Sequence, residues 1–132
     1  MVEELLNRRL VAVERLSWQT ASDSLRREVG PVRLVFDTGH ALVLSGGTDW
    51  TLDYHVTGPG DDSWLDTYKY DLDGQHWALR DAAAEEPFAD VMGAALTDWQ
   101  STFNEVSEVV GLRLWFDGHE VALTLRNGEV AT

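Results

Sequence analysis

The sequence predicts a mainly β protein with short helices, in which one helix–strand–meander unit is duplicated within the chain. The expected architecture is an antiparallel two-sheet sandwich or flattened barrel with pseudo-two-fold symmetry. A repeated phrase is the first observation behind this prediction: "RLVFDTGHALVL" begins at Arg33, and "RLWFDGHEVALTL" begins at Arg113, with Thr38 unmatched. Alternating apolar and polar residues are the second, because this pattern is typical of half-buried strands. Tight-turn sequences between the strands are the third.

Each copy of the unit is expected to open with a short helix. The segments upstream of the two phrases, "ELLNRRLVAV" and "DVMGAALTDW", align so that Asn7 falls opposite Gly93. Asn and Gly are the residues that best tolerate the left-handed conformation that ends a helix. We therefore expect a helix stop at each position, followed by a strand. Residues 8–16 fit either a helix or a strand, and their match to "LTDWQSTF" favours a strand.

The strands after these stops are predicted from alternation. "VRLVF" and "LRLWF" each place Leu and Phe on one face and Arg on the other. The turn sequences "SGGT" and "RNGE" then divide the downstream part of each unit into further strands. Each unit thus has four strands, and neither unit could bury both faces of its sheet alone. The units span residues 3–56 and 87–132 of a single domain, 1–132.

An acidic, aromatic insertion of residues 57–86 separates the two units. Its central part, "WLDTYKYDLDGQHWALR", has the alternation and the Asp-Gly turn of a β-hairpin. With four strands in each unit, this hairpin gives about ten strands and two or three short helices.

Composition narrows the function. The net charge is −13, and eleven carboxylates lie within residues 49–90 against Lys69 and Arg80. Such a surface repels phosphates, so we expect neither nucleic-acid binding nor binding to anionic membranes. The chain has no cysteine, no long apolar run and no signal-peptide pattern at its start, and a cytoplasmic location is the default expectation.

The paired turns hold the one repeated set of potential metal ligands. Asp37 and His40 recur as Asp117 and His119, and Asp and His suit zinc or a similar ion. Asp-Gly is also what a tight turn requires by itself, and hairpin tips usually lie away from a symmetry axis. We therefore interpret these residues as turns and expect no metal or other cofactor. No catalytic motif is present, and enzymatic activity is not expected.

The insertion is the best candidate for a binding surface. Tyr and Trp are enriched in interface hot spots, and insertions on a rigid scaffold often carry function. The acidic charge would steer a basic partner. The expected partner face consists of Trp64, Asp66, Tyr68, Tyr70, Asp71, Asp73 and Trp77.

The sequence thus predicts a non-catalytic protein-binding domain with a basic protein partner. The bacterial immunity proteins that neutralise toxins are an analogy at the level of class. Two alternatives stay open. One is a small-ligand or carbohydrate-binding or hydrolysing protein that uses carboxylates near the 61–81 hairpin. The other is a structural subunit of a homodimer or larger homo-oligomer, paired through strand edges.

Overall fold

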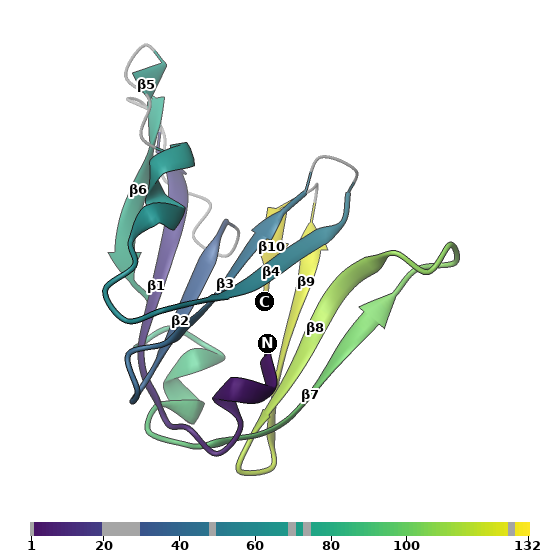
Figure 1. Ribbon diagram of the computed structural model, residues 1–132. Helices are drawn as coiled ribbons and strands as arrows, with labels where there is room; N and C mark the ends of the chain where they lie inside the picture. Colours follow the sequence, from purple (N-terminus) through teal and green to yellow (C-terminus); the bar gives the residue numbers. More distant parts are fainter. Residues whose placement is uncertain (1, 20–29, 48–49, 69–70, 73–74, 127–128) are drawn as a thin grey trace.

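The computed structural model describes residues 2–19, 30–47, 50–68, 71–72, 75–126 and 129–132, and it shows a mainly β protein made of two antiparallel sheets (Figure 1). Sheet 1 has the strand order β4-β3-β2-β1-β6-β5, and sheet 2 has the order β10-β9-β8-β7. The strands of sheet 1 are β1 (Leu10–Gln19), β2 (Val32–Phe36), β3 (Ala41–Gly46), β4 (Leu52–Thr57), β5 (Asp71–Leu72) and β6 (Gln75–Asp81). Those of sheet 2 are β7 (Leu96–Phe103), β8 (Val109–Phe116), β9 (His119–Arg126) and β10 (Glu129–Ala131). Three 3-10 helices complete the fold, η1 (Val2–Leu5), η2 (Ser63–Tyr68) and η3 (Phe88–Val91).

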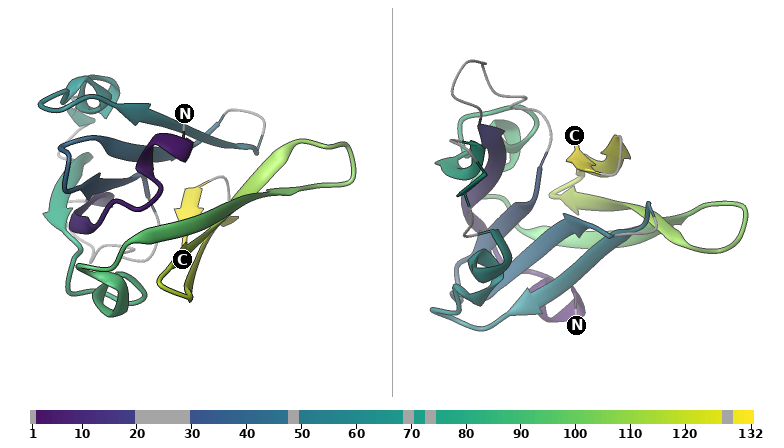
Figure 2. Two further views of the ribbon diagram at one scale, coloured as in Figure 1. Left: turned by 60° about the horizontal axis from the view of Figure 1, so that its bottom comes forward. Right: turned by 90° about the horizontal axis from the view of Figure 1, so that it is seen from above.

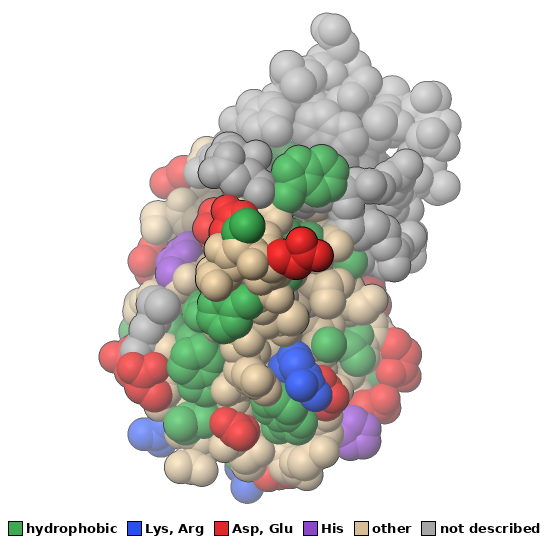
Figure 3. All heavy atoms as spheres, turned by 90° about the vertical axis from the view of Figure 1, so that its right-hand side faces the viewer, with side chains coloured by type: hydrophobic (Ala, Val, Ile, Leu, Met, Phe, Trp, Pro, Cys, Tyr) green, Lys and Arg blue, Asp and Glu red, His purple; other side chains and the backbone are tan. Residues whose placement is uncertain are grey.

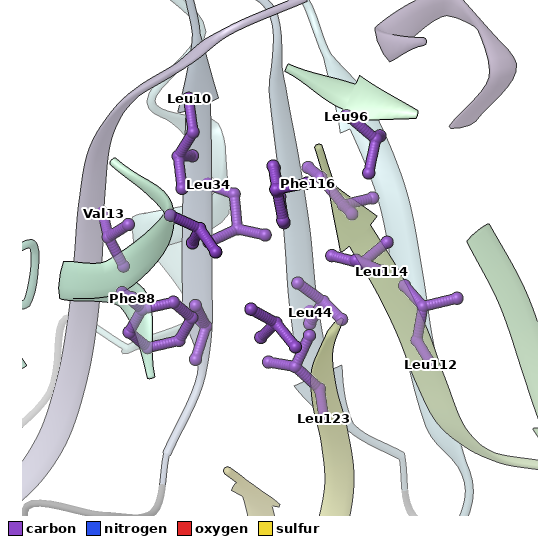
Figure 4. Close-up of a cluster of buried hydrophobic side chains, with 14 of the residues drawn as sticks. Leu10, Val13, Leu34, Leu44, Phe88, Leu96, Leu112, Leu114, Phe116 and Leu123 are labelled. Carbon is purple, nitrogen blue, oxygen red and sulfur yellow. The ribbon is translucent and has the colours of Figure 1, made fainter. Parts of the chain in front are cut away.

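The main core lies between the inner faces of the two sheets, as in a β-sandwich (Figure 4). The alternating Leu and Phe residues of β2 and β8 point into it, as the sequence predicts. At its centre, the rings of Phe36 and Phe116 stack with their centroids 6.3 Å apart. These two residues occupy the same place in the repeated phrase, so the two copies meet through corresponding side chains.

The two halves have the same order of elements, a 3-10 helix followed by four consecutive antiparallel strands. They also share an irregularity. Between β1 and β2 the register shifts after the Leu10–Phe36 pair, and between β7 and β8 it shifts after the Leu96–Phe116 pair. A β-bulge bends its strand and increases the local twist, so both long strands bend at corresponding positions. The duplication itself remains a prediction. A duplicated unit would have the shared order of elements and the matching register shifts described above.

The predicted helix stops are confirmed. Asn7 has φ 67° and Gly93 has φ 80°, and the short helices η1 and η3 precede them. Both residues then bond across the junction between the halves. Asn7 N donates to Leu96 O at 2.7 Å, and Gly93 N donates to Leu10 O at 2.8 Å. Residues 8–16 fitted either a helix or a strand, and from Leu10 onward they lie in β1.

The insertion differs from the predicted hairpin. Residues 63–68 form η2 rather than a strand, and only β5 and β6 form a hairpin. The start of η2 is fixed by Asp61, whose Oδ1 accepts hydrogen bonds from Ser63 N at 3.0 Å and from Ser63 Oγ at 2.6 Å. The return strand β6 pairs along β1 from Glu14 to Gln19 and so extends sheet 1. The polar local bonds of Asp61 outweigh the alternation that suggested a strand.

Candidate protein-binding surface

The predicted partner face is divided by the structure. Trp64 is 7% exposed and packs with Leu16 and Val43 in a second hydrophobic cluster on the outer side of sheet 1, and the half-buried Trp77 packs against the same cluster. Asp66 is exposed on η2. Tyr70 and Asp73 lie outside the described residues, as do the side chains of Tyr68 and Asp71.

Trp64 therefore does not fit the role of an exposed anchor. η2 places its indole against the sheet, where it covers apolar side chains that would otherwise face water. A residue in this position contributes mainly to stability. The sequence suggested an exposed aromatic because alternation along a strand would have set Trp64 beside Asp66 and Tyr68 on one face.

An ion-pair group fastens the same insertion to sheet 1. Arg33 Nη1 lies 2.8 Å from Glu14 Oε1 and 3.2 Å from Asp62 Oδ1, and the Arg33 side chain is only 10% exposed. The hydrogen bonds from Ser63 lower the pKa of the exposed Asp61 carboxyl below its usual value. Asp61 is thus held ionised, and it does not resemble the proton-donating carboxyl that glycoside hydrolysis requires.

The paired turns have two different conformations. In the first, Gly39 has φ 87° and its N donates to Phe36 O at 2.9 Å, which forms a three-residue turn that includes Thr38. In the second, Asp117 and Gly118 both have positive φ, 51° and 87°, as a two-residue type I′ turn requires. The Asp and Gly residues of both turns thus have the turn role that the sequence indicates.

The histidines of these turns lie in different surroundings. His40 Nδ1 is 3.1 Å from Thr38 Oγ1 within its own turn. His119 lies near Glu86, whose pKa is raised by a hydrogen bond and charge repulsion from Asp90 and lowered slightly by His119. Across the parts of the chain that the structure describes, which include Asp37, His40, Asp117 and His119, no three His, Asp or Glu side chains are grouped so that they could hold a metal ion.

A second surface, at the hairpin arm of β7 and β8, is absent from the sequence-based prediction. The arm extends beyond the rest of the fold (Figure 2). At its tip, Phe103 is 58% exposed and Val106 is 71% exposed, and they line an open depression of about 700 Å³ together with Asn104 and Glu105. The sequence signal was weak because Phe103 continues the strand pattern of "LTDWQSTF". Local alternation does not report whether a residue at the end of a strand is covered by a distant segment.

The tip of the arm is held in shape by Asn104. Its side-chain Oδ1 accepts from Val106 N and Glu108 N, both at 3.0 Å, and its backbone N donates to Glu108 O at 3.0 Å. Ser107 completes the turn with φ 62°. The exposed apolar side chains therefore stand on an ordered loop that also carries the exposed Glu105 and Glu108.

The base of the arm is attached to sheet 1. The Tyr54 hydroxyl lies 2.9 Å from Ser101 Oγ, and the Tyr54 ring meets the Trp99 ring edge-on with centroids 6.4 Å apart. β4 thus supports the inner side of β7.

On the face shown in Figure 3, Asp and Glu side chains surround scattered hydrophobic ones, and Lys and Arg are sparse.

These features define an acidic β-sandwich with an ordered apolar tip, and comparison with known proteins adds no family. No protein-family model, curated protein or solved structure matches the chain. Within the described residues, no helix combines the length and apolarity needed to cross a bilayer.

Proposed function

We propose that this chain is a non-catalytic protein-binding domain whose partner is a basic protein. The observation that carries the proposal is the tip of the β7–β8 arm. There, Phe103 and Val106 are exposed on a loop ordered by Asn104, with Glu105 and Glu108 beside them. Exposed apolar groups with a polar rim are what a protein interface requires.

The physical case rests on preorganisation and charge. Because Asn104 already fixes the loop, docking on the tip costs little conformational entropy. A net charge of −13 raises the rate at which a basic protein approaches and disfavours acidic competitors. The exposed acids of the insertion, such as Asp66, contribute to this field at longer range, whereas Trp64 serves the fold.

The class of protein that this combination suggests is an immunity-type protein that neutralises a basic toxin domain. The suggestion is an analogy at the level of class. It matches a small acidic domain whose task is to cover a basic surface. A chain without cysteine needs no oxidising compartment, and we assign it to the cytoplasm within this proposal.

The proposal is tested by affinity capture from the source cell lysate with three proteins. These are the wild type, a double variant Phe103→Ser/Val106→Ser, and Trp50→Ser as a matched control, since Trp50 is 64% exposed on a different loop. Bound proteins are identified by mass spectrometry at low salt and at about 0.5 M salt.

We expect the wild type and the control to recover the same basic protein at low salt. The double variant should recover about tenfold less of it, and high salt should release it. Recovery of an acidic or neutral partner, or equal recovery by the double variant, would contradict the proposal.

A further inference from the structure

We propose that the outer edge of β7 is a strand-addition site, on which an extended segment of the basic partner pairs antiparallel and extends sheet 2. The inference rests on the proposed function and specifies how the partner is held. Main-chain hydrogen bonds to an open sheet edge supply affinity in this mode of recognition, and alternate side chains supply specificity.

The first argument is what the corresponding edge of sheet 1 already holds. β7 corresponds to β1 in register and in the position of its bulge, since Ala12 pairs with Val35 after the first bulge and Asp98 pairs with Trp115 after the second. β1 has β2 on one side and β6 on the other, with β6 running antiparallel. β7 has β8 on one side and ends the sheet among the described strands. β1 therefore pairs antiparallel on its outer side although it has a bulge. The corresponding bulge in β7 is compatible with the same kind of pairing.

The second argument is the extent of the open edge. Leu96, at the start of β7, exchanges hydrogen bonds with Asn7 and Arg8 across the junction. The remaining residues, 97–103, have no neighbouring described strand on their outer side. Seven residues match the length of an ordinary strand.

The third argument is that β7 has few of the features that protect sheet edges. Edge strands are commonly protected by Lys or Pro, by β-bulges, by covering elements or by inward-pointing charges. Of these features β7 has register shifts, between Leu96 and Asp98 and between Thr102 and Phe103. The sequence of β7, "LTDWQSTF", contains no Lys, Arg or Pro, and its one charge is Asp98 beside the bulge. An edge of this kind is suited to pairing with another chain.

Charge selects the occupant. Asp98 lies near one end of the open edge, and Glu105 and Glu108 lie beyond the other end, in a chain of net charge −13. A second copy of the chain would bring the same charge to this edge and be repelled, whereas a strand rich in Lys or Arg would be attracted. The exposed ring of Phe103 at the end of the edge provides an apolar contact for that strand.

The test uses an octapeptide of alternating Lys and Val as the probe and the full chain labelled with ¹⁵N. On addition of the peptide, we expect the changes in chemical shift and the slowing of amide exchange to be concentrated in residues 97–103. The same peptide with every backbone nitrogen methylated keeps its charge and side chains but cannot pair as a strand, and we expect it to bind about tenfold more weakly. Phe103→Ala should lower the affinity for the probe peptide several-fold, and Trp50→Ala should leave that affinity unchanged.

Three results would overturn the strand-addition site. They are equal binding by the methylated peptide, shifts concentrated away from β7, and a homodimer in sedimentation that protects the β7 amides, since the occupant would then be a second copy. The first two leave the proposed function standing, because a basic partner would then dock elsewhere. Failure of the proposed function itself is read separately, from the salt dependence and the Phe103/Val106 variant in the capture experiment.

Discussion

Arg9 and Ala95 form an antiparallel bridge that joins the two halves of the molecule. The residues beside them exchange hydrogen bonds in matching pairs, since Leu10 N donates to Ala94 O at 3.0 Å and Leu96 N donates to Arg8 O at 2.9 Å. Each half thus enters its long strand by bonding to the other half. Because an isolated four-stranded sheet would expose its apolar face, this junction holds together two sheets that depend on each other for burial.

The left-handed stop at Gly93 gives the first prediction. A Cβ at this position would meet no atom within 4 Å, so a substitution acts only through the backbone conformation, φ 80°. Gly93→Ala should lower the free energy of unfolding by about 1–2 kcal/mol, as measured by urea denaturation. Gly93→Asn should cost roughly half as much, because Asn tolerates this conformation, as at Asn7. Equal losses for the two variants would contradict this explanation.

The two phrase turns give a prediction about strand register. Deleting Thr38 would leave Asp-Gly between Phe36 and His40, the arrangement found between Phe116 and His119. The three-residue turn should then become a two-residue type I′ turn with no change of register, and stability should stay within about 1 kcal/mol of the wild type. Cross-strand amide contacts measured by NMR would check the register.

Deleting Val35 provides the control for that experiment. The chain is shortened by the same amount, but the deletion lies inside β2 and moves its pairing by one residue. Side chains that faced the core would then face water, and the protein should fail to fold. A register shift in the Thr38 deletion would show that the Asp-Gly pair does not determine the turn.

Trp64 gives a prediction that separates its two possible roles. If the indole serves the fold, Trp64→Ala should lower the free energy of unfolding by about 3–5 kcal/mol, since it is 7% exposed in the cluster with Leu16 and Val43. Asp66→Asn, at an exposed position on the same helix, should change stability by less than about 0.5 kcal/mol. Thermal denaturation of the two variants distinguishes these outcomes. If Trp64→Ala left stability unchanged, Trp64 would again be a candidate residue of the binding surface.

Glu129 gives the prediction about pH. Partial burial raises the pKa of this carboxyl, because the charged form loses hydration. At pH values below the ordinary Glu pKa the Glu129 carboxyl is protonated in both the folded and the unfolded chain. Its burial then carries no charge-dependent cost to the free energy of unfolding. As the pH rises through the folded pKa, ionisation destabilises the folded state.

Glu129→Gln should therefore stabilise the protein at neutral pH by less than about 1 kcal/mol, since the carboxyl remains partly solvated. The gain should vanish in acid. Urea denaturation of both proteins at several pH values measures it, and a gain that is independent of pH would assign the effect to packing rather than charge.

The repeated phrase shows how much of the fold local pattern can predict. Alternation placed Leu34 and Phe36 on the inner face, and the turn residues placed the hairpins, because both depend on neighbours in the sequence. The stops at Asn7 and Gly93 could likewise be predicted, since a positive φ is a property of the single residue.

The candidate surfaces were less predictable. Residues 63–68 alternate as a strand would, yet hydrogen bonds from Ser63 to Asp61 and the burial of Trp64 favour a 3-10 helix. The exposure of Phe103 depends on where β7 ends relative to sheet 1, which alternation does not report.

The sequence alone determined the strands of the two repeated units, their turns and the acidic charge of this protein, because each depends on residue type and local spacing. Only the tertiary structure decided that β6 pairs with β1, that Trp64 faces the sheet and that the edge of β7 stays open among the described strands. Those outcomes depend on contacts between segments distant in the chain, where the burial of apolar area outweighs local preference.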